Sequence, residues 1–357
     1  MNRVYIVDIE AVETRYTAQW KKYLPKQLSD ALDNATVEVI SGGEVPQATT
    51  PGAFLNFGGT NVYKSKQLET IAEKFCNGEI QDGDYFLYTD AWNPTVIQLR
   101  YMAELLGRQI YIGGMWHAGS YDPADFLGRL IGNKPWVRNA ERSMFDCYDH
   151  NFFATQFHVD LFKESFDKID DEKIHVVGWP MEYLKEELAP YAGVEKENII
   201  LFPHRIAPEK QPEIFKDLAH EFPDYEFIVC QEKELTKDEY HKLLARAKIV
   251  FSANLQETLG ISAYEGAIVG TVPVVPDRLS YTEMYPAICK YPSNMTADFD
   301  SYMDKKKTLC AKIRDVMNSN DAYAVHIPAI LEQVDSFFNG EKLYTTIKDT
   351  INNFDNV

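Results

Sequence analysis

Two glutamates near the C-terminal end, Glu257 and Glu265, stand eight positions apart across a glycine. The apolar run before them predicts a buried strand, Leu259-Gly260 predicts a turn, and 261–269 predicts a helix. The first backbone amides of such a helix have no acceptor within the helix, so they suit a phosphate or a developing oxyanion. Glu257 would lie in the loop at the mouth of a cleft and Glu265 about one turn inside the helix, so the two carboxylates could bind hydroxyls of two different sugars. The alternative is a surface helix with two solvated glutamates.

Two cations, Arg205 and Lys210, stand five residues apart in a loop rich in proline, after an apolar strand predicted at 198–202. The segment 211–213 is typical of a helix start, because proline is tolerated in the first turn and an acid there interacts well with the helix dipole. Such a pair suits a diphosphate, since Arg offers a planar fork and Lys a compact charge. The alternative is a solvent-facing loop with unrelated charges.

These elements resemble, in order and spacing, the C-terminal half of retaining GT-B glycosyltransferases, in particular the large family 4 group. The similarity covers residues 170–295. It rests on the run 202–210 with both cations, on Asp224 to Cys230, and on the two glutamates followed by Gly270 to Val275.

The resemblance implies a nucleotide-sugar co-substrate, a UDP-sugar, from which a hexose or pentose is transferred with retention at the anomeric carbon. Arg205 and Lys210 would hold the diphosphate, Glu257 would approach the transferred sugar and Glu265 would bind the ribose. The departing phosphate oxygen would itself serve as the base. Backbone amides of three further residues complete the expected donor site: Thr258, Leu259 and Gly260.

Length and composition are those of an ordinary enzyme of two domains, with 357 residues of which 45% are hydrophobic. No apolar run approaches the roughly 18 residues that span a bilayer, and the chain begins on a predicted strand with no signal peptide, so we expect no membrane partner. The five cysteines are scattered without a C-x-x-C pair, which argues against disulfides and zinc. We expect a cytoplasmic protein, in the host cytoplasm if the chain is viral.

Charge opposes tight binding of duplex nucleic acid. The net charge is −18; residues 1–165 hold 15 Lys and Arg against 21 Asp and Glu, and 166–357 hold 21 against 33. Avid non-specific binding normally needs a basic surface. The N-terminal half is the less acidic one, and a local basic patch there stays open.

Apolar segments alternate with helical ones along the chain, which predicts parallel sheets. We therefore expect an α/β protein with the GT-B fold, two Rossmann-like domains facing a central cleft. The expected strands are 4–7, 37–40, 85–88, 110–112, 152–154, 174–177, 199–202, 227–229 and 249–251, and the clearest helices 11–24, 94–106 and 238–247.

The Gly178-Trp-Pro180 turn suggests the domain boundary. We expect an acceptor-side domain at 1–177 and a nucleotide-sugar-binding domain at 178–335. The GT-B resemblance implies that the terminal helix, 336–357, crosses back to the first domain. The loop 41–60, rich in Gly, Pro and Thr, is a candidate lid.

Polar and aromatic residues follow two predicted strands of the N-terminal half. Ligands of open α/β sheets sit beyond the carboxyl ends of strands, so Asp90, Trp92 and Trp116 are candidate acceptor-binding residues. The resemblance places His117 where related enzymes present a histidine near the donor sugar, a catalytic role shared with Glu257. The alternatives are an aspartate that caps a helix, two core tryptophans and a locally satisfied histidine.

One departure from the family lies after the first strand. Residues 8–13 contain none of the glycines with which many members approach the donor phosphate, and they carry three acids instead. The resemblance therefore leaves open how the acceptor is held and how the site closes over the donor.

Rival functions lack their motifs. Neither G-x-G-x-x-G nor the P-loop string occurs, and Asp82-Gly-Asp84 and Asp298-Phe-Asp300 do not follow strands as the metal-binding D-x-D of other transferases does. We expect a metal-independent enzyme. A nucleotide-sugar epimerase on the same scaffold, and a non-catalytic sugar-binding protein, remain as alternatives.

The N-terminal half, through 54–64, 88–94 and 116–122, also looks like a group of bacteriophage glycosyltransferases. That resemblance implies an acceptor hydroxyl on a hydroxymethylated pyrimidine in phage DNA, with the base extruded onto Trp92 or Trp116. Binding would be weak, salt-dependent and carried by Arg100, Arg138 or Arg142. The alternative acceptors are a small molecule, a glycan or a protein.

Overall fold

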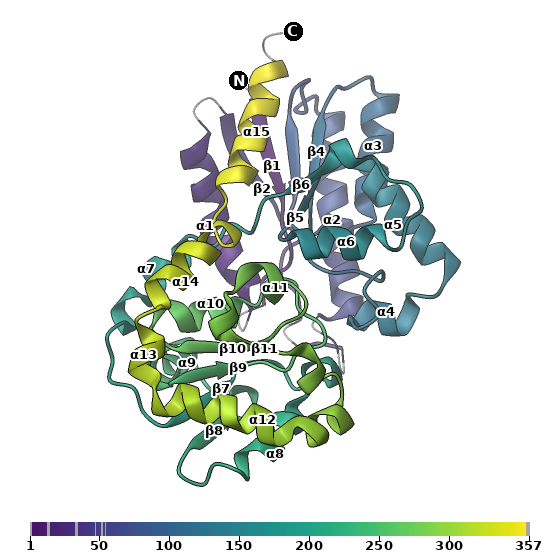
Figure 1. The fold of residues 1–357 in the computed structure, drawn as a ribbon. Coiled ribbons are helices and arrows are strands. Elements are labelled where there is room, and N and C mark those ends of the chain that lie inside the picture. The colour runs from purple at the N-terminus through teal and green to yellow at the C-terminus, as the bar shows by residue number, and fades with distance from the viewer. Residues whose placement is uncertain are drawn as a thin grey trace. The chain divides into compact units, whose positions relative to one another are not determined.

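The computed structural model describes residues 2–12, 15–32, 35–46, 48–50, 53 and 55–354 (Figure 1). The chain forms two compact units. Unit 1 comprises residues 1–181 and 339–357, and unit 2 comprises 182–338. The sequence placed these divisions at 177/178 and 335/336.

Unit 1 is built on a parallel sheet of six strands in the order β2-β1-β3-β4-β5-β6. Parallel strands are buried on both faces and therefore read as nearly continuous apolar runs, as β3 does with Tyr-Phe-Leu-Tyr. The strands are β1 (Asn2–Val7), β2 (Ala35–Ile40), β3 (Tyr85–Tyr88), β4 (Tyr111–Trp116), β5 (His150–Phe153) and β6 (Ile174–Val176).

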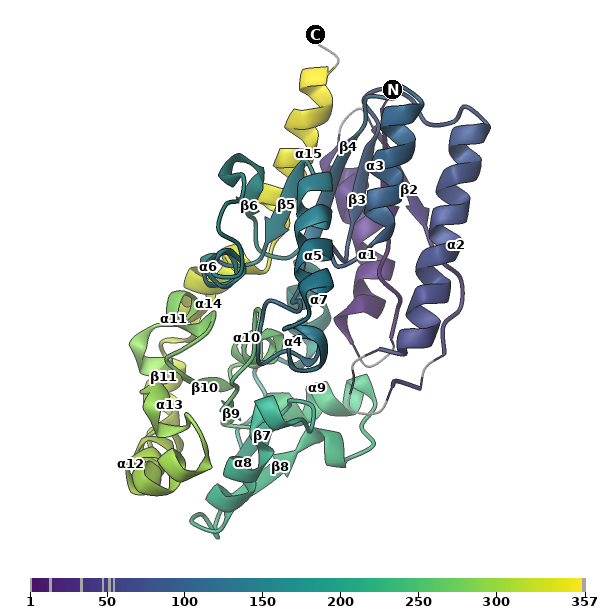
Figure 2. The same ribbon diagram turned by 90° about the vertical axis from the view of Figure 1, so that its right-hand side faces the viewer.

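Helices cover both faces of this sheet. On one face α1 (Tyr16–Ala31) packs beside α15 (Glu341–Phe354), and on the other α2 (Phe57–Cys76), α3 (Thr95–Leu105) and α5 (Pro135–Cys147) follow one another (Figure 2). The short α4 (Phe126–Ile131) precedes α5, and α6 (Gln156–Lys163) follows β5. The C-terminal helix thus belongs to unit 1, where it buries Leu343, Ile347 and Ile351.

Two sequence-predicted boundaries in unit 1 are wrong. The helix expected at 11–24 spans Tyr16–Ala31 instead, and the Val12 amide before it donates to the Thr17 hydroxyl at 3.1 Å. The candidate lid at 41–60 ends inside α2, whose start is capped by the Asn56 side chain on the Gly59 amide at 2.8 Å. The rest of that prediction includes residues 47, 51, 52 and 54, which lie outside the described residues.

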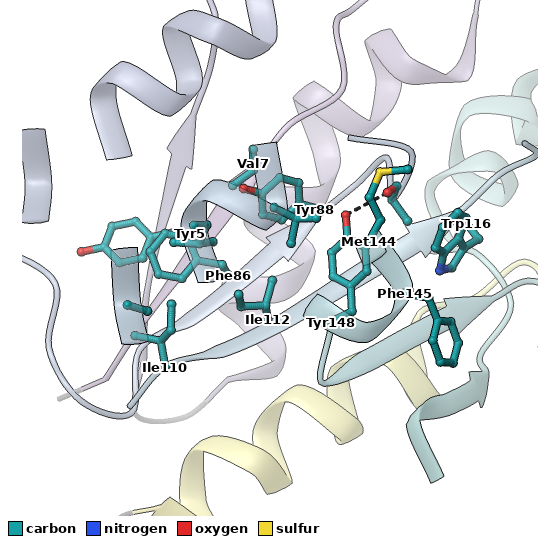
Figure 3. Close-up of a cluster of buried hydrophobic side chains, with 14 of the residues drawn as sticks. Tyr5, Val7, Phe86, Tyr88, Ile110, Ile112, Trp116, Met144, Phe145 and Tyr148 are labelled. Atoms are coloured by element: carbon teal, nitrogen blue, oxygen red, sulfur yellow. Dashed lines mark hydrogen bonds between the residues drawn. The ribbon is translucent and has the colours of Figure 1, made fainter. Parts of the chain in front are cut away.

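The core of unit 1 decides the position of Trp116 (Figure 3). The sequence ended this strand at residue 112, but Gly113 and Gly114 both lie inside β4, where the rings of Phe152 and Tyr148 fill the space that a Cβ atom would need. The strand therefore runs on to Trp116, which is fully buried and donates its indole N–H to Asn151 at 2.9 Å. A stacking platform must be accessible, so the prediction of Trp116 as an acceptor-binding residue is wrong.

Unit 2 has a parallel sheet of five strands in the order β11-β10-β9-β7-β8. The helices α8 and α12 pack together, and α10 packs with α7 and α14. The strands are β7 (Ile199–Phe202), β8 (Glu226–Val229), β9 (Ile249–Phe251), β10 (Val272–Pro276) and β11 (Lys290–Tyr291). The helices are α7 (Tyr183–Leu188), α8 (Pro212–Ala219), α9 (Lys237–Arg246), α10 (Ile261–Ile268), α11 (Tyr281–Met284), α12 (Phe299–Asn318), α13 (Asn320–Ala324) and α14 (Ile327–Val334).

These two sheets confirm the predicted fold class of two parallel Rossmann-like units. All nine strands expected from apolar runs are present, with ends shifted by a few residues. Among the described residues no helix combines the length and the apolar character needed to cross a membrane.

Candidate functional site

Two loops of unit 2 lie side by side at the carboxyl edge of its sheet. They follow β7 and β9, which are neighbouring strands, and contain the predicted cations and the first glutamate respectively. The Leu255 amide donates to the Glu209 carbonyl at 2.7 Å, and the Gln211 side chain donates to the Ala253 carbonyl at 2.6 Å. The structure thus brings together two motifs that are about fifty residues apart in sequence.

Lys210 and Glu257 form the centre of this arrangement. Lys210 is only 7% exposed, and its ammonium lies 3.2 Å from Oε2 of Glu257 and donates to the Gln256 carbonyl. Burial alone would raise the pKa of Glu257, but the charge of Lys210, together with hydrogen bonds from its ammonium and from the Gly260 amide, holds that pKa below its ordinary value. Glu257 is therefore a largely buried carboxylate that stays ionised at neutral pH.

Arg205 is fixed within its own loop. Its guanidinium pairs with the carboxylate of Glu209, which is almost completely buried, and the Arg205 side chain remains partly exposed. A guanidinium has five N–H groups in a planar fork, so it can contact more than one anion.

Two buried side chains that the sequence reasoning did not single out support Glu257. Asn254 donates to Oε2 of Glu257 at 2.9 Å. Its amide also lies 3.4 Å from Nδ1 of His204, whose Nε2–H donates to the Phe251 carbonyl at 3.2 Å. Burial, followed by the charge of Lys210, lowers the pKa of His204 to about 4, so this histidine is neutral. His204 stands beside the Arg205 motif, which is a usable signal, whereas nothing in the sequence marks Asn254.

The start of α10 is set by Gly260. This residue adopts a left-handed conformation with φ of 70°, and a Cβ atom there would collide with the ring of Tyr281. Only glycine satisfies both conditions without strain. Leu259 is buried next to it and Thr258 precedes them, so the backbone of 258–260 leads directly into the first turn of α10, as predicted.

Glu265 lies one turn inside α10 in a different environment from Glu257. Its Oε2 accepts a hydrogen bond of 2.9 Å from the hydroxyl of Tyr240 on α9. Burial raises the pKa of Glu265 to about 7, against which the Tyr240 hydrogen bond and the charge of Lys237 act only partly. The two glutamates of the motif therefore differ in protonation at neutral pH.

In unit 1 both ring nitrogens of His117 are engaged. Nε2 donates to the Thr89 carbonyl at 2.5 Å, so Nδ1 of the neutral ring accepts from the Tyr16 hydroxyl at 2.5 Å. Trp179 and Trp20 pack against the same ring with centroids 4.7 and 5.3 Å away. Burial lowers the pKa of His117 to about 4. In this arrangement neither nitrogen is left to orient a sugar hydroxyl.

Asp90 and Trp92 are held by neighbours within unit 1. Oδ2 of Asp90 lies 3.0 Å from the ammonium of Lys64, and Oδ1 accepts from the Trp92 amide at 3.1 Å. The Trp92 indole donates to the buried carboxylate of Glu141 at 2.9 Å and packs partly buried against the core. Both residues follow the carboxyl end of β3, as predicted, but their polar groups already have partners within unit 1.

Two buried carboxyl groups lie in the loop after β1, and the sequence analysis did not single them out as site residues. Asp8 accepts from Gln67 at 2.9 Å and from the Tyr63 hydroxyl, and burial raises its pKa to about 6. Glu10 is 2% exposed, and within the described part of the chain neither of its oxygens has a hydrogen-bond partner. The missing glycines of this loop were the signal that it is unusual.

Potential metal ligands do not cluster in the described part of the chain: no three His, Cys, Asp or Glu side chains come together there as a metal ion would require.

Comparison with solved structures identifies the fold of the chain. No family model matches the chain. A structure of sucrose-phosphate synthase from Thermosynechococcus elongatus superimposes over the whole of both chains with a TM-score of 0.67 and 10% identity. A UDP-forming alpha,alpha-trehalose-phosphate synthase from Burkholderia vietnamiensis does so with a TM-score of 0.60 and 9% identity. The fold is GT-B.

Among curated proteins, the tRNA-queuosine alpha-mannosyltransferase of Drosophila melanogaster is 29% identical over 119 residues. That alignment covers 26% of this chain and 32% of the relative, so the similarity spans about a third of the relative's length. The GT-B architecture therefore rests on the complete chain, whereas the sequence similarity rests on a part of it.

The raised pKa of Glu265 predicts a pH-dependent stability. Between its ordinary value of 4.5 and about 7, the folded chain keeps a proton that the unfolded chain has lost, so the free energy of unfolding falls as pH rises through this range. Glu265→Gln should remove that loss and be more stable than the wild type by about 1–3 kcal/mol at pH 8 but not at pH 5.

Calorimetric unfolding at both pH values measures this, with Glu186→Gln, at an exposed position of α7, as the control that should follow the wild type. Equal unfolding temperatures for wild type and Glu265→Gln at pH 8 would contradict the assigned protonation.

Proposed function

We propose that the protein is a retaining glycosyltransferase that moves a sugar from a nucleotide-sugar, a UDP-sugar, to a hydroxyl of an acceptor. The observation that carries the proposal is the pair of Lys210 with Glu257 just before the start of α10, with Arg205, which pairs with Glu209, in the same loop as Lys210. The full-length structural similarity to a UDP-forming synthase supports the choice of donor.

The donor diphosphate would be bound by Arg205, Lys210 and the amides of 258–260. Lys210 already faces a carboxylate, and a diphosphate adds two negative charges that the guanidinium and the opening helix amides can share. Each charge-assisted hydrogen bond contributes on the order of 1.5–3 kcal/mol. Their interaction with the diphosphate is strongest when the leaving group develops its full charge in the transition state. They therefore lower the activation barrier of transfer and not only the free energy of the bound donor.

Glu257 would act on the transferred sugar. Its carboxylate is kept ionised by Lys210 and held in place by Asn254, so it can steady positive charge on the sugar ring as the bond to phosphate breaks. The proton of the acceptor hydroxyl would go to the departing phosphate oxygen, so no protein base is needed.

Glu265 would bind the ribose hydroxyls of the nucleotide. Its pKa of about 7 means that a mixture of protonated and ionised forms meets the donor at neutral pH. A diol donates to the ionised form, so donor binding should favour loss of the proton.

The acceptor is proposed to be a hydroxyl on a modified nucleic-acid base. The resemblance of unit 1 to phage enzymes favours a hydroxymethylated pyrimidine in DNA, while the name of the curated relative points to a modified base in tRNA. Glu10, a buried carboxyl group without a partner among the described residues, is the unit 1 group we assign to the acceptor hydroxyl in place of His117. His117 would position Thr89 and Tyr16 instead.

The direct test is incubation with a panel of nucleotide-sugars, with hydroxymethylated DNA, with tRNA or with no acceptor, read by mass spectrometry. We expect transfer to one nucleic acid, and activity that survives excess EDTA because Arg205 and Lys210 replace a metal ion at the diphosphate. Interconversion of the nucleotide-sugar without acceptor would favour an epimerase. No turnover with any donor would favour a sugar-binding protein.

Removal of either cation should disable the donor site. Arg205→Ala and Lys210→Ala should each lower turnover by about 10²-fold or more and weaken UDP binding, because the charge on the leaving group is no longer balanced. Steady-state kinetics and calorimetric titration with UDP measure both effects. Lys216→Ala, an exposed cation on α8 paired with Glu232, is the matched control and should leave both unchanged. Wild-type kinetics in both site variants would refute the donor assignment.

The two glutamates should separate in kinetics. Glu265→Gln should mainly raise the KM for the donor, since it weakens ribose contacts that exist before and during reaction, whereas Glu257→Gln should mainly lower kcat. Initial rates against donor concentration for both variants decide this. The reverse pattern would exchange the two roles.

A further inference from the structure

An exposed surface of unit 1 lies between α4 and α5, here called the α4–α5 tip. Its indole, Trp136, is 57% exposed and its neighbour Leu130 is 61% exposed, so neither packs into the core. Single exposed apolar side chains are common, whereas several on one short segment form a candidate contact surface for a partner. The tip consists of Arg129, Leu130, Asn133, Lys134, Pro135 and Trp136, all exposed.

The charge of this surface is opposite to that of the chain. The protein has 54 acidic residues against 36 basic ones, yet residues 126–145 contain a single acid, Glu141, and that side chain is fully buried. The exposed charges of the tip, Arg129 and Lys134, are both positive, and Arg129 also donates to the Ala124 carbonyl. A polyanion would therefore meet no exposed acid between residues 126 and 145.

The tip lies at the edge of the sheet where the candidate acceptor residues lie. Glu141 on α5 accepts from the Trp92 indole at 2.9 Å and from the Ser120 amide at 2.7 Å, and these belong to the loops that follow β3 and β4. Trp136 precedes Glu141 by five residues on the same helix, a rise of about 7–8 Å. Since α5 leads back to the start of β5, its first turn is at the carboxyl edge of the sheet (Figure 2).

The backbone of the tip is tightly constrained. A Cβ atom at Gly128 would collide with the Asp122 carbonyl, and one at Gly132 with the carbonyl of Ser120, so α4 approaches the loop after β4 more closely than other residues allow. Asp125 caps α4 through the Leu127 amide at 2.9 Å, and Pro135 begins α5. Trp136 is thus presented from a rigid element, which limits the entropy lost on binding.

The cations that the sequence suggested for nucleic-acid contact are used elsewhere. Arg100 pairs with Asp149 at 2.7 Å, Arg138 with Glu141 at 2.7 Å and Arg142 with Asp146 at 3.0 Å. Trp116 is in the core and Trp92 is bonded to Glu141. We therefore look for nucleic-acid contact at the exposed tip instead of at these residues.

We propose that the α4–α5 tip is a nucleic-acid docking surface, on which an unpaired base stacks on Trp136 while Lys134 and Arg129 contact phosphates. Stacking on an exposed indole tolerates any base, and flanking cations track the backbone, so the pair of features fits a single-stranded or loop segment. This proposal rests on the proposed function, in that the docked strand would carry the modified base that is glycosylated.

The test is binding of a fluorescent single-stranded DNA and a fluorescent RNA stem-loop to the full chain, measured by anisotropy at several salt concentrations. Trp136→Ala should weaken binding about tenfold or more, Trp136→Phe should largely restore it, and Lys134→Glu should weaken binding and flatten its salt dependence. Comparing the DNA and RNA probes identifies the source of the strand.

Matched controls are Tyr101→Ala, an aromatic residue 64% exposed on α3, and Lys66→Glu, an exposed cation on α2; both should bind as the wild type does. Equal binding by Trp136→Ala and Tyr101→Ala, or no wild-type binding at low salt, would overturn the proposal. Self-association lost in Trp136→Ala would also overturn it, in favour of a second copy.

Donor chemistry is measured in parallel so that the two proposals fail separately. UDP binding and hydrolysis of the UDP-sugar should be unchanged in Trp136→Ala, because the donor groups are in unit 2. Nucleic-acid binding without donor turnover would refute the glycosyltransferase function and support the docking surface. Donor turnover without Trp136-dependent binding would support the glycosyltransferase function and refute the docking surface.

Discussion

The candidate donor site depends on one buried ion pair, Lys210 with Glu257. An ammonium removed from water costs several kcal/mol unless charges and hydrogen bonds replace the water, and here Glu257 and the Gln256 carbonyl do so. Because Lys210 comes from the loop after β7 and both partners from the loop after β9, the pair fixes the two loops against each other. The positive charge is thereby placed before any donor arrives, and electrostatic catalysis requires such preorganisation.

The same short segment gives its two glutamates opposite properties. Glu257 faces a cation and has a lowered pKa, whereas Glu265 faces the Tyr240 hydroxyl and has a pKa raised to about 7. The difference follows from the turn at Gly260, which leaves the first glutamate in the loop and carries the second into α10. Carboxyl groups whose environments separate their pKa values in this way can take different tasks at one site.

The two parallel sheets could be predicted from the sequence, because buried parallel strands leave nearly continuous apolar runs. The order of the Arg205, Lys210 and Glu257 motifs is also visible in the sequence, and the structure brings the loops that contain them together. What failed were features decided by distant neighbours. The strand expected to end at residue 112 runs on through Gly113 and Gly114, and the rings of Tyr148 and Phe152, distant in the sequence, fill the space beside those glycines. Ion pairs of Arg138 and Arg142 could have been expected, since their partners stand three and four residues away on one helix. The partner of Arg100 is 49 residues away and leaves no such signal.

A strongly acidic chain can still use a nucleic acid as acceptor, because the range of electrostatic forces is short. At 0.1 M salt the Debye length is about 10 Å, so acids farther than this from a phosphate are largely screened. What the phosphate meets is the local surface, and between residues 126 and 145 the one acid is buried. The net charge of −18 then limits contact to a small area and keeps binding weak. Weak binding suits an enzyme that must release a large product after each transfer, since tight holding of substrate and product lowers KM without raising kcat.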